Sequence, residues 1–153
     1  MPEKQTFHNI IGGEVQPSAD GAMMDIVNPA TGEVYASAPN SSAADVDLAC
    51  RAAGEAFAKW RWTTPSERQR ALLKLADLIE DNADELVAIE SENTGKPRAL
   101  TLSEEIPPMV DQIRFFAGAA RVLEGRSSGE YMRGFTSSIR REPVGPVDRK
   151  SVV

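Results

Sequence analysis

The sequence has few of the residues that carry most metal and thiol chemistry. Among its 153 residues there is one cysteine, Cys50, and one histidine, His8. A single cysteine excludes an internal disulfide and a cysteine-based zinc site, and a single histidine removes most metal and serine–histidine chemistry. Cys50 falls on the apolar face of a predicted helix without a nearby base, so we expect a buried structural thiol rather than a nucleophile.

Basic residues and long apolar runs are also scarce. The chain has 23 acidic and 17 basic residues, a net charge of −6, whereas nucleic-acid binding needs a basic footprint. No apolar run approaches the roughly 20 residues that span a bilayer. The first ten residues lack the basic and apolar segments of a secretory signal. We therefore expect a cytoplasmic protein with no nucleic-acid and no membrane partner.

Complete nucleotide-binding and catalytic motifs are missing. Gly95-Lys96 lacks the upstream glycine and the following serine or threonine of a P-loop, and no G-x-G-x-x-G occurs. Gly95 and Pro97 instead predict the end of a helix, because glycine adopts a left-handed cap and proline cannot continue the helix.

Other conspicuous groups have simple structural interpretations. The acidic clusters are interpreted as solvated faces or charges at helix N-termini. The aromatic pairs are interpreted as core anchors. These groups are Asp81-Asp84-Glu85, Glu104-Glu105, Trp60/Trp62 and Phe115/Phe116.

The first part of the chain, residues 7–38, predicts short strands joined by turns. Gly12-Gly13 separates two short apolar pieces, which is typical of a hairpin. A second pair of strands is expected at 24–27 and 33–38, on either side of the turn at 28–32, where Asn-Pro and a later glycine supply turn chemistry.

Three helical regions follow, at 42–60, 64–94 and 99–124. Ser42 with Asp45, and Thr64 with Glu67, resemble capping boxes. The second region is expected to restart near Asn82. Pro107-Pro108 should interrupt the third region, because proline donates no helix hydrogen bond. The apolar spacing predicts these inward positions: Val46, Cys50, Ala53, Phe57, Leu72, Leu75, Ala76, Ile79, Leu86, Ile89, Val110, Ile113, Phe116 and Ala120.

The last part of the chain predicts a hairpin at 129–142 with Gly134 in its turn. The segment Arg141 to Gly145 resembles a strand that leads into a turn, because Pro143 and Gly145 are residues typical of turns. Composition and spacing alone therefore describe an α/β fragment without a catalytic constellation.

Several strings, in order, resemble the NAD(P)-dependent aldehyde dehydrogenase superfamily. Each string is weak alone, but six of them occur at the family's spacing across residues 7–147. The strings include Val27-Asn28-Pro29-Ala30-Thr31-Gly32-Glu33-Val34, Thr94-Gly95-Lys96-Pro97, Phe115-Phe116-Ala117-Gly118 and Arg141-Glu142-Pro143-Val144-Gly145.

This resemblance implies an α/β aldehyde dehydrogenase-like fold, of which the chain is the N-terminal portion. Residues 1–128 would belong to an incomplete cofactor-binding domain, and 129–147 to the hairpin of an oligomerisation arm. The segments 105–111 and 129–141 look most like 4-aminobutyraldehyde dehydrogenases, with betaine-aldehyde dehydrogenases as the neighbouring choice. The parent protein would then be a homo-oligomer, a dimer or a tetramer.

The same resemblance implies the chemistry of the parent. Such enzymes oxidise an aldehyde with NAD through a cysteine thiolate, an oxyanion hole that includes an asparagine, and a glutamate that activates water. All of these residues lie beyond Gly145 in the family, so no catalytic and no cofactor-binding residue is expected in this chain. The resemblance does imply a monovalent-cation site at Ile26, Val27 and Asn93, with oxygen ligands; an ordinary turn packed on a helix end is the alternative.

The final residues, 148–153, depart from the family. They are the translation of GAT CGG AAG AGC GTC GTG, the start of a common sequencing-library adapter, so we expect a non-native tail. A genuine tail on a truncated paralogue is the alternative. A different class of function also stays open, in which the chain is a non-catalytic helical interaction module.

Overall fold

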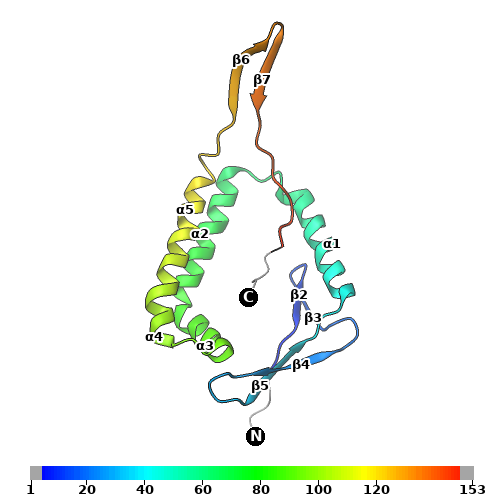
Figure 1. Ribbon diagram of the computed structural model, residues 1–153, viewed down its shortest axis with the longest axis vertical. Helices are drawn as coiled ribbons and strands as arrows, with labels where there is room; N and C mark the ends of the chain where they lie inside the picture. Colours follow the sequence, from blue (N-terminus) through cyan, green and yellow to red (C-terminus); the bar gives the residue numbers. More distant parts are fainter. Residues whose placement is uncertain (1–4, 149–153) are drawn as a thin grey trace.

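The structure, a computed structural model, describes residues 5–148. Apart from Asp148, the expected non-native tail lies outside these residues. Figure 1 shows an open arrangement in which the helices α2 to α5 (residues 65–119) and the helix α1 (Ala43–Trp60) stand on opposite sides, above the N-terminal strands. The hairpin of β6 (Arg126–Met132) and β7 (Phe135–Ile139) projects away from the far end.

Short strands form the N-terminal part, as the sequence predicts. β1 (Gln5–Thr6), β5 (Val34–Pro39) and β4 (Met23–Val27) make one sheet in that order. β5 pairs parallel with β1 and antiparallel with β4, and the register shifts between Ile26 and Val27. β2 (Asn9–Ile11) and β3 (Glu14–Gln16) form the predicted hairpin, whose two turn glycines have positive φ angles of 64° and 89°.

The helix α1 (Ala43–Trp60) is anchored at its start by Asp45. This carboxylate accepts hydrogen bonds from the Ser42 amide at 2.7 Å, the Ser42 hydroxyl at 2.9 Å and the Ala19 amide at 2.7 Å. The bonds from Ser42 lower the pKa of Asp45, with a smaller contribution from Ala19. One acid therefore caps the helix and fastens it to the loop that precedes β4.

The second predicted helical region is two helices, α2 (Pro65–Asp81) and α3 (Ala83–Thr94). Thr64 and Glu67 form the predicted capping box, with the Thr64 amide donating to Glu67 at 2.6 Å and the Glu67 amide donating to Thr64 Oγ1 at 3.3 Å. The chain turns at Asn82, where the sequence predicts a restart.

The proline pair does not separate two helices, contrary to the predicted break. α4 (Arg98–Leu100) continues through the π-helical segment η1 (Thr101–Glu105) into α5 (Ile106–Ala119), with right-handed helical backbone throughout. The prolines follow closely on the π-helical segment, whose wider turn departs from the regular i→i−4 hydrogen bonding at the point where their amide protons are missing. α5 also ends at Ala119, before the predicted end of this region at 124.

The best-packed part is the α2–α5 pair, with α3 beside it. Its core consists of Ala76, Val87, Ile106 and Val110, with Ile79, Ala83 and Ile113 partly buried against it. On the surface of the pair, Arg114 donates to Glu80 at 2.6 Å and to Asp77 at 2.9 Å. These bonds raise the pKa of Arg114. In the described part of the chain, no helix combines the length and apolar character needed to cross a membrane.

The hairpin consists of β6 (Arg126–Met132) and β7 (Phe135–Ile139), with Gly134 in its turn at a φ of 81°. It begins three residues before the predicted start at 129, because the Ser-Ser-Gly stretch belongs to β6 and not to a loop. The predicted strand at 141–145 is wrong. Residues 140–148 have no regular secondary structure, since no neighbouring strand within residues 5–148 pairs with them.

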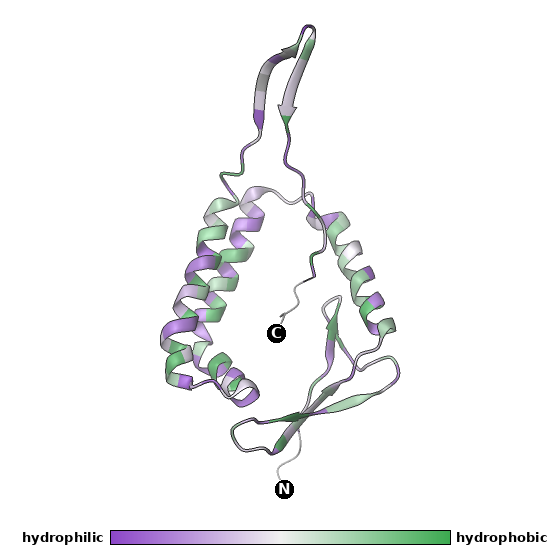
Figure 2. Cartoon of the chain, viewed as in Figure 1, coloured by the Kyte–Doolittle hydropathy of each residue, from purple (hydrophilic) through white to green (hydrophobic). Residues whose placement is uncertain are grey.

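The molecule exposes far more surface than a compact protein of its size. Its accessible surface is 12204 Å², whereas a compact monomer of 16.6 kDa would expose about 7,600 Å². Figure 2 shows apolar residues distributed along the helices and strands, and many of the large ones are exposed. Large apolar areas of this kind are typical of surfaces that contact other protein segments.

Several expected core residues are therefore exposed in this chain. Cys50 is exposed, and so are both aromatic pairs, with Trp62 at 72% and Phe115 at 65%. The other exposed inward predictions are Val46, Ala53, Leu75, Leu86 and Ile89. Apolar spacing identifies a face that can be covered, but residues 5–148 do not contain the segments that would cover these faces.

Candidate functional site

The three predicted cation ligands lie on elements that meet at one corner of the molecule. Ile26 and Val27 end β4, at the irregular register with β5, immediately before the Asn-Pro turn. The turn is closed by Asn28, whose amide donates to the Glu33 carbonyl at 2.9 Å and whose carbonyl accepts from the Gly32 amide at 2.8 Å. Asn93 lies in the last turn of α3.

Two contacts bring the turn and the helix end together. The Tyr35 hydroxyl of β5 donates to Asn93 Oδ1 at 3.3 Å. Gly95 follows α3 in the left-handed conformation, with a φ of 75°, and a side-chain carbon there would lie 3.1 Å from Pro29 Cγ. The predicted left-handed cap is confirmed, and glycine is needed both for this φ and for the close approach of Pro29.

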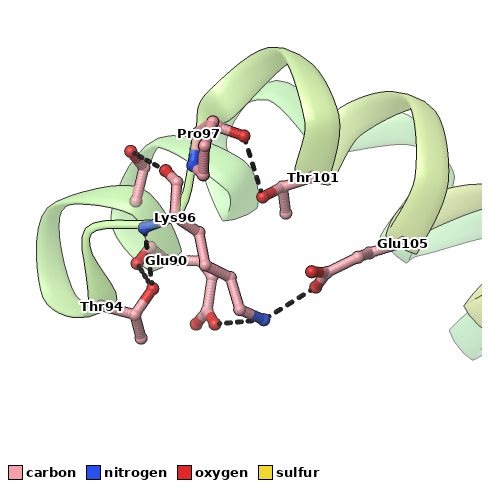
Figure 3. Close-up of polar contacts among 7 residues, drawn as sticks. Glu90, Thr94, Lys96, Pro97, Thr101 and Glu105 are labelled. Atoms are coloured by element: carbon pink, nitrogen blue, oxygen red, sulfur yellow. Dashed lines mark hydrogen bonds and ion pairs between the residues drawn. The ribbon is translucent and has the colours of Figure 1, made fainter.

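Lys96 joins α3 to the π-helical segment (Figure 3). Its Nζ lies 2.8 Å from Glu105 Oε2 and 3.2 Å from Glu90 Oε1. Hydrogen bonds to Glu105 and then to Glu90 raise the pKa of Lys96. These two ion pairs make Lys96 a structural link between α3 and the π-helical segment.

Further hydrogen bonds hold the backbone around Lys96. Ser91 Oγ donates to the Lys96 carbonyl at 2.7 Å, and Thr101 Oγ1 donates to the Pro97 carbonyl at 3.1 Å. The sequence pattern predicts a solvated face or a helix N-terminal charge at Glu105 and does not reveal its contact with Lys96. Lys96 and Glu105 are nine positions apart and on different elements, so no spacing rule for a single helix connects them.

This corner offers oxygen ligands of the kind that hard cations prefer. Ile26 and Val27 can supply only backbone carbonyls, while Asn93 Oδ1 has a second lone pair besides the one that accepts from Tyr35. The negative end of the α3 dipole also favours a cation nearby. Among residues 5–148, no group of three or more histidine, cysteine, aspartate and glutamate side chains could hold a metal ion.

Neither of the other reactive side chains belongs to such a site. Cys50 lies exposed on α1, and His8 lies exposed between β1 and β2. The contacts described above therefore join the Asn-Pro turn to the end of α3 in one structural corner.

Comparison with known proteins decides the family. The model of the aldehyde dehydrogenase family matches residues 15–149. This chain belongs to the aldehyde dehydrogenase family. An aldehyde dehydrogenase of Deinococcus radiodurans is 39% identical over 80% of this chain and 24% of its own length. A long-chain-aldehyde dehydrogenase of Acinetobacter is 38% identical over the same shares, 80% and 24%.

Solved aldehyde dehydrogenase structures share the fold. The NAD-dependent enzyme of Sinorhizobium meliloti has a TM-score of 0.78 and 36% identity, covering 86% of this chain and 26% of that one. The NAD⁺ complex of the Bacillus cereus enzyme has a TM-score of 0.83 and 32% identity, covering 93% and 29%. The expected aldehyde dehydrogenase-like α/β fold is confirmed. The chain spans about a quarter of the length of the curated relatives that it matches.

Proposed function

We propose that this chain forms the N-terminal portion of a longer NAD-dependent aldehyde dehydrogenase, which oxidises an aldehyde to a carboxylate in the cytoplasm. The observation that carries the proposal is the family match across residues 15–149. The NAD-dependent activity and bound NAD⁺ of similar solved structures support the choice of cofactor.

In this reaction a cysteine thiolate adds to the aldehyde carbonyl and forms a thiohemiacetal. NAD supplies the hydride acceptor. Water, activated by a glutamate, then releases the acid from the resulting thioester. None of these roles falls to a residue of this chain, which contributes α2, α5 and the N-terminal strands as scaffold.

The proposed substrate is 4-aminobutyraldehyde. Support comes from the segments 105–111 and 129–141, which resemble that subfamily in sequence. The test is to read the gene beyond the codon for Val147, express the protein that continues the family pattern, and compare aldehydes. We expect a higher kcat/KM for 4-aminobutyraldehyde than for betaine aldehyde or succinate semialdehyde, and the reverse order would reject this substrate.

The 153-residue chain itself should be inactive. With NAD and 4-aminobutyraldehyde it should produce no NADH above a blank, and NAD should cause no saturable change in a binding titration. The reason is that the family's thiolate, glutamate and cofactor-binding residues all follow Gly145 in sequence. Saturable NADH production by the purified chain would contradict the proposal.

We further propose that the β6–β7 hairpin is an oligomerisation arm of the parent and that Ile26, Val27 and Asn93 bind a monovalent cation. The Tyr35–Asn93 contact and the close approach of Pro29 to Gly95 support the second assignment. Asn93→Asp should increase the stabilisation that potassium or sodium gives relative to choline, because a carboxylate attracts a cation more strongly than an amide. An unchanged cation dependence of the urea midpoint would argue for an ordinary turn packed on a helix end.

A further inference from the structure

A groove rich in arginine lies where the hairpin leaves the helical body. It consists of two cavities of about 580 and 420 Å³, which share Arg68, Leu123, Arg140 and Arg141 as lining residues. The first cavity also includes Arg126 of β6, and the second includes Arg61 between α1 and α2. We call the combined surface the arginine groove.

The charge of this groove is opposite to that of the whole chain. The first cavity is lined by four arginines and no acid, and the second adds Arg61 and one acid, Glu142. The chain as a whole has a net charge of −6. Like charges gathered in one hollow repel one another, so the arrangement favours binding of a compensating anion.

Neutral partners orient several of these guanidinium groups without removing their charge. Arg141 Nε donates to the Glu124 carbonyl at 3.1 Å, and Arg68 donates to the Thr63 carbonyl. Arg61 lies 5.2 Å from the centroid of the Phe57 ring and 5.1 Å from that of Trp62. These contacts hold positive charge in place and leave other N–H donors available for a ligand.

The arginines that line the groove have few close carboxylate partners. Arg140 Nε lies 3.8 Å from Glu142 Oε1, a long contact between two well exposed side chains. Within residues 5–148, no ion pair joins Arg126 to an acid. Elsewhere on the molecule arginine has closer partners, as in the bond of 2.6 Å from Arg114 to Glu80.

We propose that the arginine groove binds a small multivalent oxyanion, with phosphate or carboxylate groups held by Arg126, Arg140 and Arg141. The planar fork of arginine matches both kinds of group through paired N–H donors. More than one negative charge is expected, because the groove gathers several arginines, of which Arg126 has no acidic partner within residues 5–148 and Arg140 has only the long contact to Glu142. A long nucleic-acid chain is a poorer ligand, since the acidic surface outside the groove would repel it.

The two tryptophans of the chain provide a direct readout, because Trp60 and Trp62 both line the second cavity. The experiment titrates the 153-residue chain with inorganic pyrophosphate, at low micromolar protein concentration and 150 mM sodium chloride, and follows tryptophan fluorescence. We expect a saturable change, since a bound anion would reposition Arg61 relative to Trp62 or alter solvent contact with the two rings.

The test variant is Arg126→Gln with Arg140→Gln. Neither side chain supports a backbone carbonyl, so the fold should survive, which far-ultraviolet circular dichroism would check. The control is Arg51→Gln with Arg133→Gln, which removes the same charge outside the groove. We expect the dissociation constant to rise at least about tenfold in the test variant and less than about twofold in the control.

Two results would overturn the proposal. One is the absence of a saturable change with the original chain, and the other is an equal loss of affinity in the test and control variants, which would indicate general charge attraction. Citrate distinguishes the ligand types. If citrate competes with pyrophosphate, the groove accepts carboxylates as well; if it does not, the groove is a phosphate site, and either result supports oxyanion binding.

Discussion

At the scale of single residues, the structure shows why position 95 requires glycine. Its φ of 75° lies in the left-handed region, and an added Cβ would lie 3.1 Å from Pro29 Cγ. Both features disfavour any larger residue. Glycine at position 95 is therefore needed both to end α3 and to allow the close approach of Pro29.

Gly95→Ala should lower the free energy of unfolding by about 1–3 kcal/mol, because a non-glycine residue is strained in this conformation. Urea unfolding followed by circular dichroism at low protein concentration would measure it. Gly54→Ala is the matched control, since Gly54 lies inside α1 with nothing within 4 Å of its added Cβ. There alanine should be neutral or stabilising by up to about 1 kcal/mol, and equal destabilisation of both variants would contradict the argument.

Asp45 should make stability depend on pH. Its pKa is lowered below the ordinary value of 3.8 in the folded chain, so its stabilising effect is complete above 3.8 and is lost as pH falls through the lower folded value. Asp45→Asn should therefore be less stable than the original chain at pH 6. The gap between their urea midpoints should shrink below pH 3.8, and a constant gap would contradict this role.

At the scale of elements, the faces that the helices bury differ from those that spacing predicts. In α3 the sequence analysis expects Leu86 and Ile89 to point inward, but Val87 is the buried residue at 3% exposure. Ile106, which was not among the predicted inward positions, enters the core at 8%. The π-helical segment precedes Ile106 and widens the helix, which changes the register of the residues that follow.

Two isoleucine substitutions distinguish the burial seen in the structure from the burial that apolar spacing predicts. Ile106→Ala should destabilise the chain by about 2 kcal/mol, because it leaves a cavity between α2 and α5. Ile89→Ala should change the free energy of unfolding by less than about 0.5 kcal/mol, as expected for a surface position, since Ile89 is 52% exposed. The urea midpoint measures both changes. A larger destabilisation by Ile89→Ala than by Ile106→Ala would favour the faces predicted from apolar spacing over those buried in the structure.

At the scale of the whole molecule, the surface exceeds that of a compact protein by more than half. Only the α2–α5 pair and its neighbours form a small core within the described residues. Isolated helices and a lone two-stranded hairpin are marginal in water. The secondary structure of this chain therefore depends on weak tertiary packing.

The isolated chain should be helical by circular dichroism but loosely packed and prone to associate. We expect it to increase the fluorescence of a hydrophobic dye and to form larger species as its concentration rises, because exposed apolar faces and strand edges promote association. Light scattering and amide resonances would check this. A compact monomer with dispersed amide resonances at every concentration would contradict it and favour an autonomous interaction module.

Much of the local structure follows from the sequence alone. Some features depend only on residues within a few positions of one another, so the sequence pattern predicts them. They are the turn glycines, the capping pairs at Ser42 and Thr64, and the left-handed cap at Gly95. The ordered strings that resemble aldehyde dehydrogenases also identify the family, since each string fits a local turn, cap or helix of the shared fold.

Only the tertiary structure decided which faces are buried and which distant charges meet. Lys96 reaches Glu90 and Glu105, and Arg68 joins Arg126, Arg140 and Arg141 in one groove. These outcomes depend on where whole elements lie and on how the π-helical segment sets the register before α5. Burial depends on what covers a face, and a periodic pattern contains no information about the position or presence of the segment that covers it.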